Sequence, residues 1–183
     1  MRAELRGNGW GYWRSKRGLF VKVTSTQTAL PLWSDIVQFA SVSTPSGTYH
    51  IVALNGLALD VISESVAKES YPLRALKLNR CAYQKWRIEP RDFSDVFSIR
   101  WAGAQPRVLQ PDGQGSKPDS QVFTALSEDQ DQEHWLLRKE ERAGSYAIIH
   151  RSSGLALSLR EDGPAVILDD WKDEDRQHWQ LIA

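Results

Sequence analysis

The chain of 183 residues is poor in the features that most readily reveal a protein's class. It has one cysteine, Cys81, so no disulfide can form within it. This excludes the disulfide framework of many small secreted repeat domains and fits a reducing compartment. No stretch approaches the roughly 20 apolar residues that a membrane-spanning helix needs. Methionine occurs only at position 1.

The chain also lacks net charge, since 23 Lys and Arg balance 23 Asp and Glu. A neutral molecule has no strong overall attraction to nucleic acid or to an anionic membrane, so neither partner is expected. No compact apolar stretch directly follows the basic start, as a secretory signal would require. With the single cysteine, this predicts a cytoplasmic protein.

Residues 1–46 carry six Lys and Arg against two acids and share no pattern with the rest of the chain. A cluster of turn residues, Ser43–Gly47, marks their end. We expect an N-terminal extension over 1–46 that is irregular and poorly ordered or holds a short helix near 33–41. An organellar transit peptide and a misassigned start are the alternatives. The folded domain is then 47–183.

What the chain does contain is a repeated tripeptide. Gln84–Trp86, Glu133–Trp135 and Gln177–Trp179 place three tryptophans 49 and 44 residues apart, and a short apolar run follows each. A second marker, Gly56–Val61, recurs as Gly154–Leu159. A period of this size indicates a repeat architecture, with three copies that each end at their tripeptide.

Between these markers the pattern is that of short β-strands separated by turn residues. Asn55-Gly56 is typical of a tight hairpin turn. No helical period is evident, and regular short strands favour a closed all-β architecture without exposed edges. The twelve predicted strands are 49–54, 57–61, 73–78, 86–88, 96–101, 107–109, 122–126, 135–137, 146–150, 155–159, 165–168 and 179–182.

We interpret the tripeptides as structural. Each tryptophan should fill the base of its copy with its indole N–H hydrogen-bonded, and the preceding glutamine should bond the backbone of the turn before it. Glu133 can accept hydrogen bonds but not donate them, so we expect a looser turn in copy two. The predicted structural residues are Gln84, Trp86, Trp135, Gln177 and Trp179.

Gln-x-Trp at this spacing, twice intact and once as Glu-x-Trp, resembles the ricin-B-type β-trefoil family. The absence of disulfides makes the chain most similar to the mushroom trefoil lectins and the mycocypin-type protease inhibitors. The resemblance implies a β-trefoil over residues 47–183, built from three four-strand repeats of about 46 residues with pseudo-threefold symmetry. It predicts the fold more specifically than the function.

In the lectins of that family, a functional copy supplies an acid at the end of its second strand, a stacking aromatic on or after the third, and an asparagine near the tripeptide. Copy one keeps the acid as Asp60 and offers Asn79 before its tripeptide. Leu76 stands where the aromatic belongs, so Tyr83 or Tyr71 is the expected substitute platform. Arg74 is the expected donor to the sugar or to Asp60.

The other copies match less well. Copy two has Gln110 and Ala125 in place of the acid and the aromatic, which predicts no sugar site there. Copy three lacks the acid but ends its third strand with polar and aromatic residues. We see no packing reason for the tryptophan among them and expect it to be exposed. The candidate residues for a second sugar site are Asp169, Trp171 and Lys172.

No nucleophile–base pair, metal-ligand spacing or phosphate loop is recognisable, so we expect no catalysis, metal or cofactor. The leading prediction is a lectin that binds glycans or glycoproteins, and a homodimer is one assembly open to it. The alternative is a protease inhibitor acting through the loops 63–70 and 111–120, with Lys68 and Lys117 entering a trypsin-like pocket. A purely structural interaction module is a third class.

Overall fold

The structure is a computed structural model that describes residues 5–6, 10–14, 20–24, 45–61, 70–91, 96–105, 107–112 and 117–183. Internal contacts divide the chain into two units, Met1–Thr44 and Pro45–Ala183, and each is described by itself. Within the described ranges, no helix has both the length and the apolar character needed to cross a bilayer.

The first unit contains a small antiparallel sheet in the order β1-β2-β3. Its strands are β1 (Leu5–Arg6), β2 (Trp10–Arg14) and β3 (Phe20–Thr24). The repeat pattern does not extend into this unit, so the sequence analysis predicts no strand here. These segments are nevertheless rich in the aromatic and β-branched residues that strands favour. The helix expected near 33–41 lies outside the described residues.

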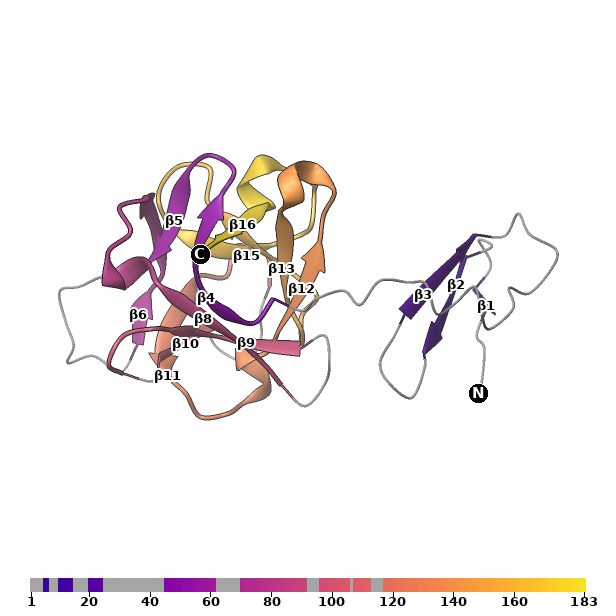
Figure 1. Cartoon of the computed structure of the whole chain (residues 1–183), viewed down its shortest axis with the longest axis horizontal. Helices are drawn as coiled ribbons and strands as arrows, with labels where there is room; N and C mark the ends of the chain where they lie inside the picture. Colours follow the sequence, from indigo (N-terminus) through magenta and orange to yellow (C-terminus); the bar gives the residue numbers. More distant parts are fainter. Residues whose placement is uncertain are drawn as a thin grey trace. The chain divides into compact units, whose positions relative to one another are not determined.

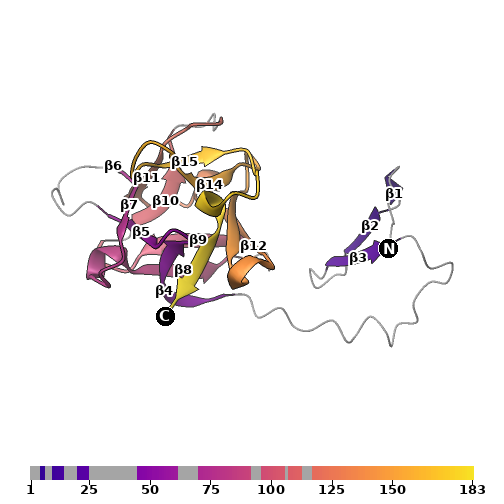
Figure 2. The ribbon, with the colours of Figure 1, turned by 90° about the horizontal axis from the view of Figure 1, so that it is seen from above.

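The second unit is a β-trefoil with a closed antiparallel barrel at its centre. Each of six strands pairs with two others, so the ring has no free edge. The last strand of the chain pairs with the first strand of this unit, and the C-terminus therefore lies beside β4 (Figures 1 and 2). The barrel strands are β4 (Gly47–Ala53), β8 (Trp86–Pro90), β9 (Val96–Trp101), β12 (Trp135–Lys139), β13 (Tyr146–His150) and β16 (Trp179–Ile182).

Three hairpins, one from each copy, complete the fold. They are hydrogen-bonded to one another, for example from the Leu73 N–H to the Val122 carbonyl and from the Leu168 N–H to the Ser120 carbonyl, both at 2.8 Å. All twelve predicted strands are present, and β6 (Ser70–Pro72), which pairs with β11, is an addition. The hairpins are β5 (Leu57–Asp60) with β7 (Arg74–Lys77), β10 (Arg107–Pro111) with β11 (Val122–Leu126), and β14 (Ala156–Leu159) with β15 (Val166–Asp169).

The three repeated tryptophans occupy equivalent places. Trp86, Trp135 and Trp179 are fully buried in one shared hydrophobic core. Each indole N–H donates to the carbonyl of a leucine in the second strand of its own copy. The acceptors are Leu59 at 3.0 Å, Leu109 at 3.0 Å and Leu157 at 2.9 Å. This repeated contact confirms the predicted burial and hydrogen bonding of all three side chains.

A single 3-10 turn precedes each tryptophan, and its last residue is the buried Gln or Glu of the tripeptide. The turns are η1 (Ala82–Gln84), η2 (Asp131–Glu133) and η4 (Asp175–Gln177). A fourth, η3 (Arg142–Gly144), precedes β13.

Gln84 and Gln177 bond the backbone of the turn before them, as predicted. Gln84 Nε2 donates to the Lys77 carbonyl at 3.1 Å, and Gln177 Nε2 donates to the Asp170 carbonyl at 2.7 Å. In copy two, Glu133 instead accepts twice, from the Glu128 N–H at 2.6 Å and from the Ser127 hydroxyl at 2.7 Å. Both carboxylate oxygens of Glu133 are thus hydrogen-bonded, and the looser turn expected in copy two stays a prediction.

We predict that Trp135→Ala lowers the free energy of unfolding by about 3–5 kcal/mol, because it empties a fully buried indole site. Trp135→Phe should cost less but should still leave the Leu109 carbonyl without its donor. Urea unfolding followed by circular dichroism measures both variants. Tyr83→Ala, at an exposed aromatic of the same domain, is the control and should change stability little. An equal loss in the control would show that Trp135 has no special place in the core.

Candidate functional site

The candidate site of copy one begins with an acid and an arginine on adjacent strands. Asp60 ends β5 and faces Arg74 of β7 directly across the hairpin. The Asp60 side chain is 7% exposed and that of Arg74 is 37% exposed, with 3.8 Å between Arg74 Nε and Asp60 Oδ1. This is too long for a hydrogen bond. The buried Nε of Arg74 has no hydrogen-bond partner among the described residues.

Gln84 connects Asp60 to the turn before the tripeptide. Its side chain hydrogen-bonds the Asp60 carboxylate, while its Oε1 accepts from the Asn79 N–H at 2.8 Å. Burial raises the pKa of Asp60, although the Gln84 hydrogen bond and the charge of Arg74 oppose that rise. Arg74 thus lies beside Asp60, as the sequence predicts, and Gln84 links Asp60 to the Asn79 backbone, which was not predicted.

The alternative platform, Tyr71, is wrong as an exposed ring. It is buried, and the Arg107 guanidinium lies over it.

Asn79 and Tyr83 both help to build the turn itself. The Asn79 Oδ1 accepts from the Cys81 N–H at 2.9 Å, which is a local turn contact. The ring of Tyr83, in η1, is 40% exposed and lies parallel to the indole of Trp101 with centroids 6.0 Å apart. Trp101 is held by a 3.0 Å bond from its Nε1 to the Ala82 carbonyl.

The Tyr83–Trp101 pair was not predicted, because Trp101 belongs to copy two and ends β9. One sequence feature could have revealed the pair, because Trp101 lies one repeat length before His150 and the two residues are therefore equivalent. Both residues pair with the tripeptide tryptophan of the preceding copy, Trp86 and Trp135 respectively. Pairing across the boundary between copies thus extends the exposed aromatic surface beside copy one.

In copy three, Asp169 is already satisfied by its neighbours. Its carboxylate accepts from Arg176 at 2.9 Å, from Lys172 at 3.2 Å and from the Asp170 N–H at 2.8 Å. Burial alone would raise the pKa of Asp169, but these hydrogen bonds outweigh it and hold the pKa below its usual range. Asp169 and Lys172, the acid and the lysine of the predicted second site, therefore bond each other.

The expected exposure of Trp171 is wrong. Its ring is partly buried and packs against the small apolar cluster of Ala147, Ile149 and Ala156. The guanidinium of Arg138, in β12, lies over this ring at 4.6 Å from the ring centroid, in a cation–π contact. These partners lie more than ten residues away in the sequence, so the local run of charges around Trp171 gave no sign of them.

The described residues of copy two form no site comparable to that of copy one. Its Gln110 and Ala125 are placed at the positions equivalent to Asp60 and Leu76, by the matching hairpin registers. Among the loop lysines considered for protease binding, Lys117 is exposed and Lys68 lies outside the described residues.

One arrangement resembles a catalytic triad and was not predicted. His178 lies 2.9 Å by Nδ1 from the Ser145 hydroxyl and 2.8 Å by Nε2 from an Asp173 carboxylate oxygen. Ser145 and His178 are fully buried, and the Ser145 hydroxyl also lies 2.7 Å from the Arg142 carbonyl. In this conformation the serine oxygen is closed to a solvent-borne substrate, so we interpret the group as a buried link between η3 and the last tripeptide.

Metal-binding chemistry has little support where side chains are described. No group of three or more His, Cys, Asp or Glu in the described residues is arranged to hold a metal ion. Cys81 is a free, partly buried thiol.

Solved structures confirm the architecture. A designed threefold-symmetric protein, ThreeFoil, has a TM-score of 0.67 at 22% identity over 75% of this chain and 99% of its own. The Rhizoctonia solani agglutinin gives 0.66 at 20% identity, covering 78% and 99%. A Polyporus squamosus lectin gives 0.64 at 15% identity, covering 75% of this chain and 49% of the lectin.

At these identities the likenesses establish the β-trefoil fold and no more. No protein-family model matches the chain, and no curated protein matches it in sequence. The relation to the Gln-x-Trp family and to the mycocypin type therefore stays a prediction.

We predict that Asp60→Asn preserves or raises stability at neutral pH. Because the pKa of Asp60 is raised above 3.8 on folding, the folded chain binds this proton more readily than the unfolded chain. The Asp60 contribution to stability therefore increases as pH falls from neutral through the raised pKa. Asparagine keeps an acceptor for Gln84 without the buried charge.

Urea midpoints of the wild type and Asp60→Asn, measured from about pH 7 down to about pH 4, test this. The difference between them should shrink as the wild-type carboxyl takes up its proton. A variant that is strongly destabilised at neutral pH would show that the Asp60 charge supports the fold.

Proposed function

We propose that this protein is a non-catalytic carbohydrate-binding protein whose site lies in copy one. The observation that carries the proposal is the Asp60–Arg74 ion pair, in which a carboxylate lies beside a guanidinium whose side chain is partly exposed. Sugar hydroxyls both donate and accept, so an adjacent carboxylate and guanidinium suit them. The Tyr83–Trp101 pair adds an apolar surface beside the same turn.

The structural neighbours support this class of function, because agglutinins and lectins are among them. Copy three lacks comparable free groups, since its Asp169 is satisfied and Trp171 is packed. One shallow site implies weak binding of a single glycan, of the order of 4–5 kcal/mol, or roughly millimolar. Useful avidity would then require multivalent glycans or several copies of the protein.

We predict that a glycan array on the full chain gives hits that Asp60→Asn abolishes while the far-ultraviolet spectrum stays unchanged. Tyr83→Ala should weaken the same hits roughly tenfold, because a ligand ring that stacks on an aromatic side chain gains about 1–3 kcal/mol. Asp169→Asn in copy three is the matched control and should leave them intact.

Hits that persist in Asp60→Asn would remove copy one as the site. A clean array together with inhibition of papain or trypsin would favour the protease-inhibitor alternative instead.

A further inference from the structure

The three copies present the same short segment of backbone around their tripeptides. In each, the residue five positions before the buried Gln or Glu donates its N–H to the side-chain Oε1 of that residue. The donors are Asn79, Glu128 and Lys172, at 2.8, 2.6 and 2.7 Å. The segments 77–85, 126–134 and 170–178 are therefore equivalent position by position, and their side chains can be compared directly.

These equivalent segments carry very different charges. Segment 77–85 has three basic residues and no acid, so its formal charge is +3. Segment 126–134 has four acids and no Lys or Arg, which gives −4. Segment 170–178 has four acids and two basic residues, which gives −2. A neutral chain thus concentrates positive charge at one of three otherwise matching turns.

One of the basic residues stands where the backbone disfavours it. The residue four positions before the buried Gln or Glu has a positive φ in every copy: 59° at Arg80, 57° at Asp129 and 59° at Asp173. Aspartate tolerates this left-handed conformation better than arginine, because its short side chain hydrogen-bonds locally. The local geometry therefore does not explain Arg80, which points to a role for its charge.

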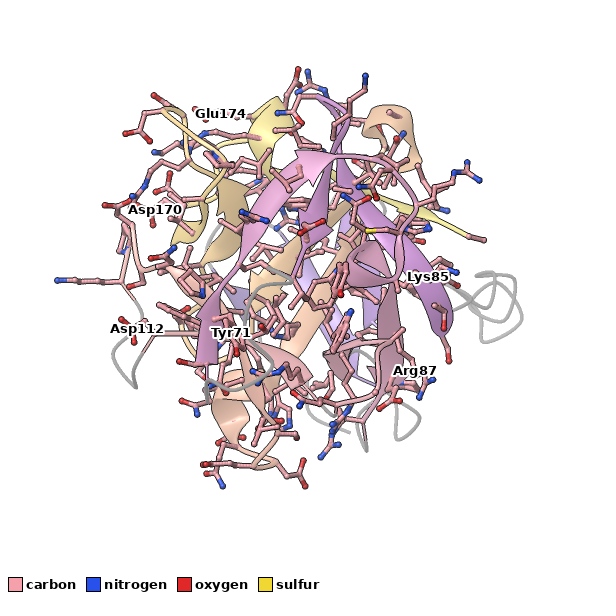
Figure 3. All side chains as sticks on the ribbon, turned by 90° about the vertical axis from the view of Figure 1, so that its left-hand side faces the viewer. Tyr71, Lys85, Arg87, Asp112, Asp170 and Glu174 are labelled. Carbon is pink, nitrogen blue, oxygen red and sulfur yellow. The ribbon has the colours of Figure 1, made fainter. Side chains whose placement is uncertain are left out.

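The cationic turn is also the one with an exposed aromatic. Lys77, Arg80 and Lys85 are all exposed, and Tyr83 lies between them in the chain with 40% of its surface accessible. The residues equivalent to Tyr83 in the other copies are Gln132 and Arg176. Figure 3 shows Lys85 and Arg87 on one side of the domain, and Asp112, Asp170 and Glu174 on the other.

We propose that the turn 77–85 recognises an acidic carbohydrate, with the sugar ring on the exposed side of Tyr83, which Trp101 supports, and its carboxylate or sulfate paired with Arg80 and Lys85. This inference rests on the proposed function and names the substrate class of the same copy. Arginine forms bidentate hydrogen bonds to carboxylate and sulfate-like oxygens, and lysine adds a point charge. Because both are exposed, their contribution is screened by salt.

The experiment measures binding of the full chain to three probes by calorimetry: a heparin hexasaccharide, a hyaluronan hexasaccharide and neutral chitotetraose. Heparin carries sulfates and carboxylates, whereas hyaluronan carries carboxylates alone, so the pair separates the two anions. The test variant is Arg80→Asp with Lys85→His, which installs residues that the equivalent positions of copy three hold and so should fold. Its matched control is Lys117→Gln with Lys139→Asp, which makes the same total charge change outside the turn.

We expect at least one acidic probe to bind more tightly than chitotetraose, and the Arg80→Asp, Lys85→His variant to weaken it at least tenfold. The control should change it less than threefold, and raising the salt concentration should weaken wild-type binding. Asp60→Asn distinguishes this inference from the proposed function. Neutral-glycan binding that depends on Asp60 but not on Arg80 and Lys85 would overturn the inference and leave the proposed function standing.

Three further outcomes would overturn the inference. Equal binding of a short single-stranded oligothymidylate would show that the turn attracts any polyanion. The free protein could instead form a salt-sensitive dimer that is lost in the Arg80→Asp, Lys85→His variant. That result would show that the basic turn binds an acidic turn of a second copy of the chain. Absence of binding to every glycan would end both this inference and the proposed function.

Discussion

The hydrogen bond from a buried indole N–H to a second-strand carbonyl is the contact on which each copy depends. It ties the fourth strand to the second, 22 to 27 residues earlier in the chain. The same tryptophans form the centre of one shared core. A four-strand copy cannot cover its own apolar face, so the three copies are stable only together.

Near that hydrogen bond, the three copies share the same turn backbone but differ in the side chains that the turn exposes. The buried Gln or Glu uses its side chain to close the turn, and in copy two both carboxylate oxygens of Glu133 accept hydrogen bonds. The exposed positions make none of these contacts, so each copy presents different side chains on the same backbone. This is the physical sense in which a site is added to a fold rather than required by it.

The copies illustrate two uses of that freedom. In copy three, acids and bases satisfy one another, and Arg138 lies over the Trp171 ring. In copy one, the Arg74 side chain beside Asp60 is partly exposed, and the Tyr83 ring is 40% exposed. Accessible polar groups beside an apolar ring are what a ligand site needs. Copy one is therefore the functional candidate, although its match to the lectin pattern is incomplete.

The sequence by itself indicated a threefold repeat, its twelve strands and the burial of three tryptophans, because repeat spacing and strand alternation reflect the shared core. The trefoil itself followed from the resemblance to the Gln-x-Trp family. The sequence also predicted that Arg74 lies near Asp60. Only the tertiary structure decided that Trp101 extends the surface of Tyr83 and that Trp171 is packed. Those contacts join residues of different copies, and nothing in a linear pattern records which side chains meet when a barrel closes.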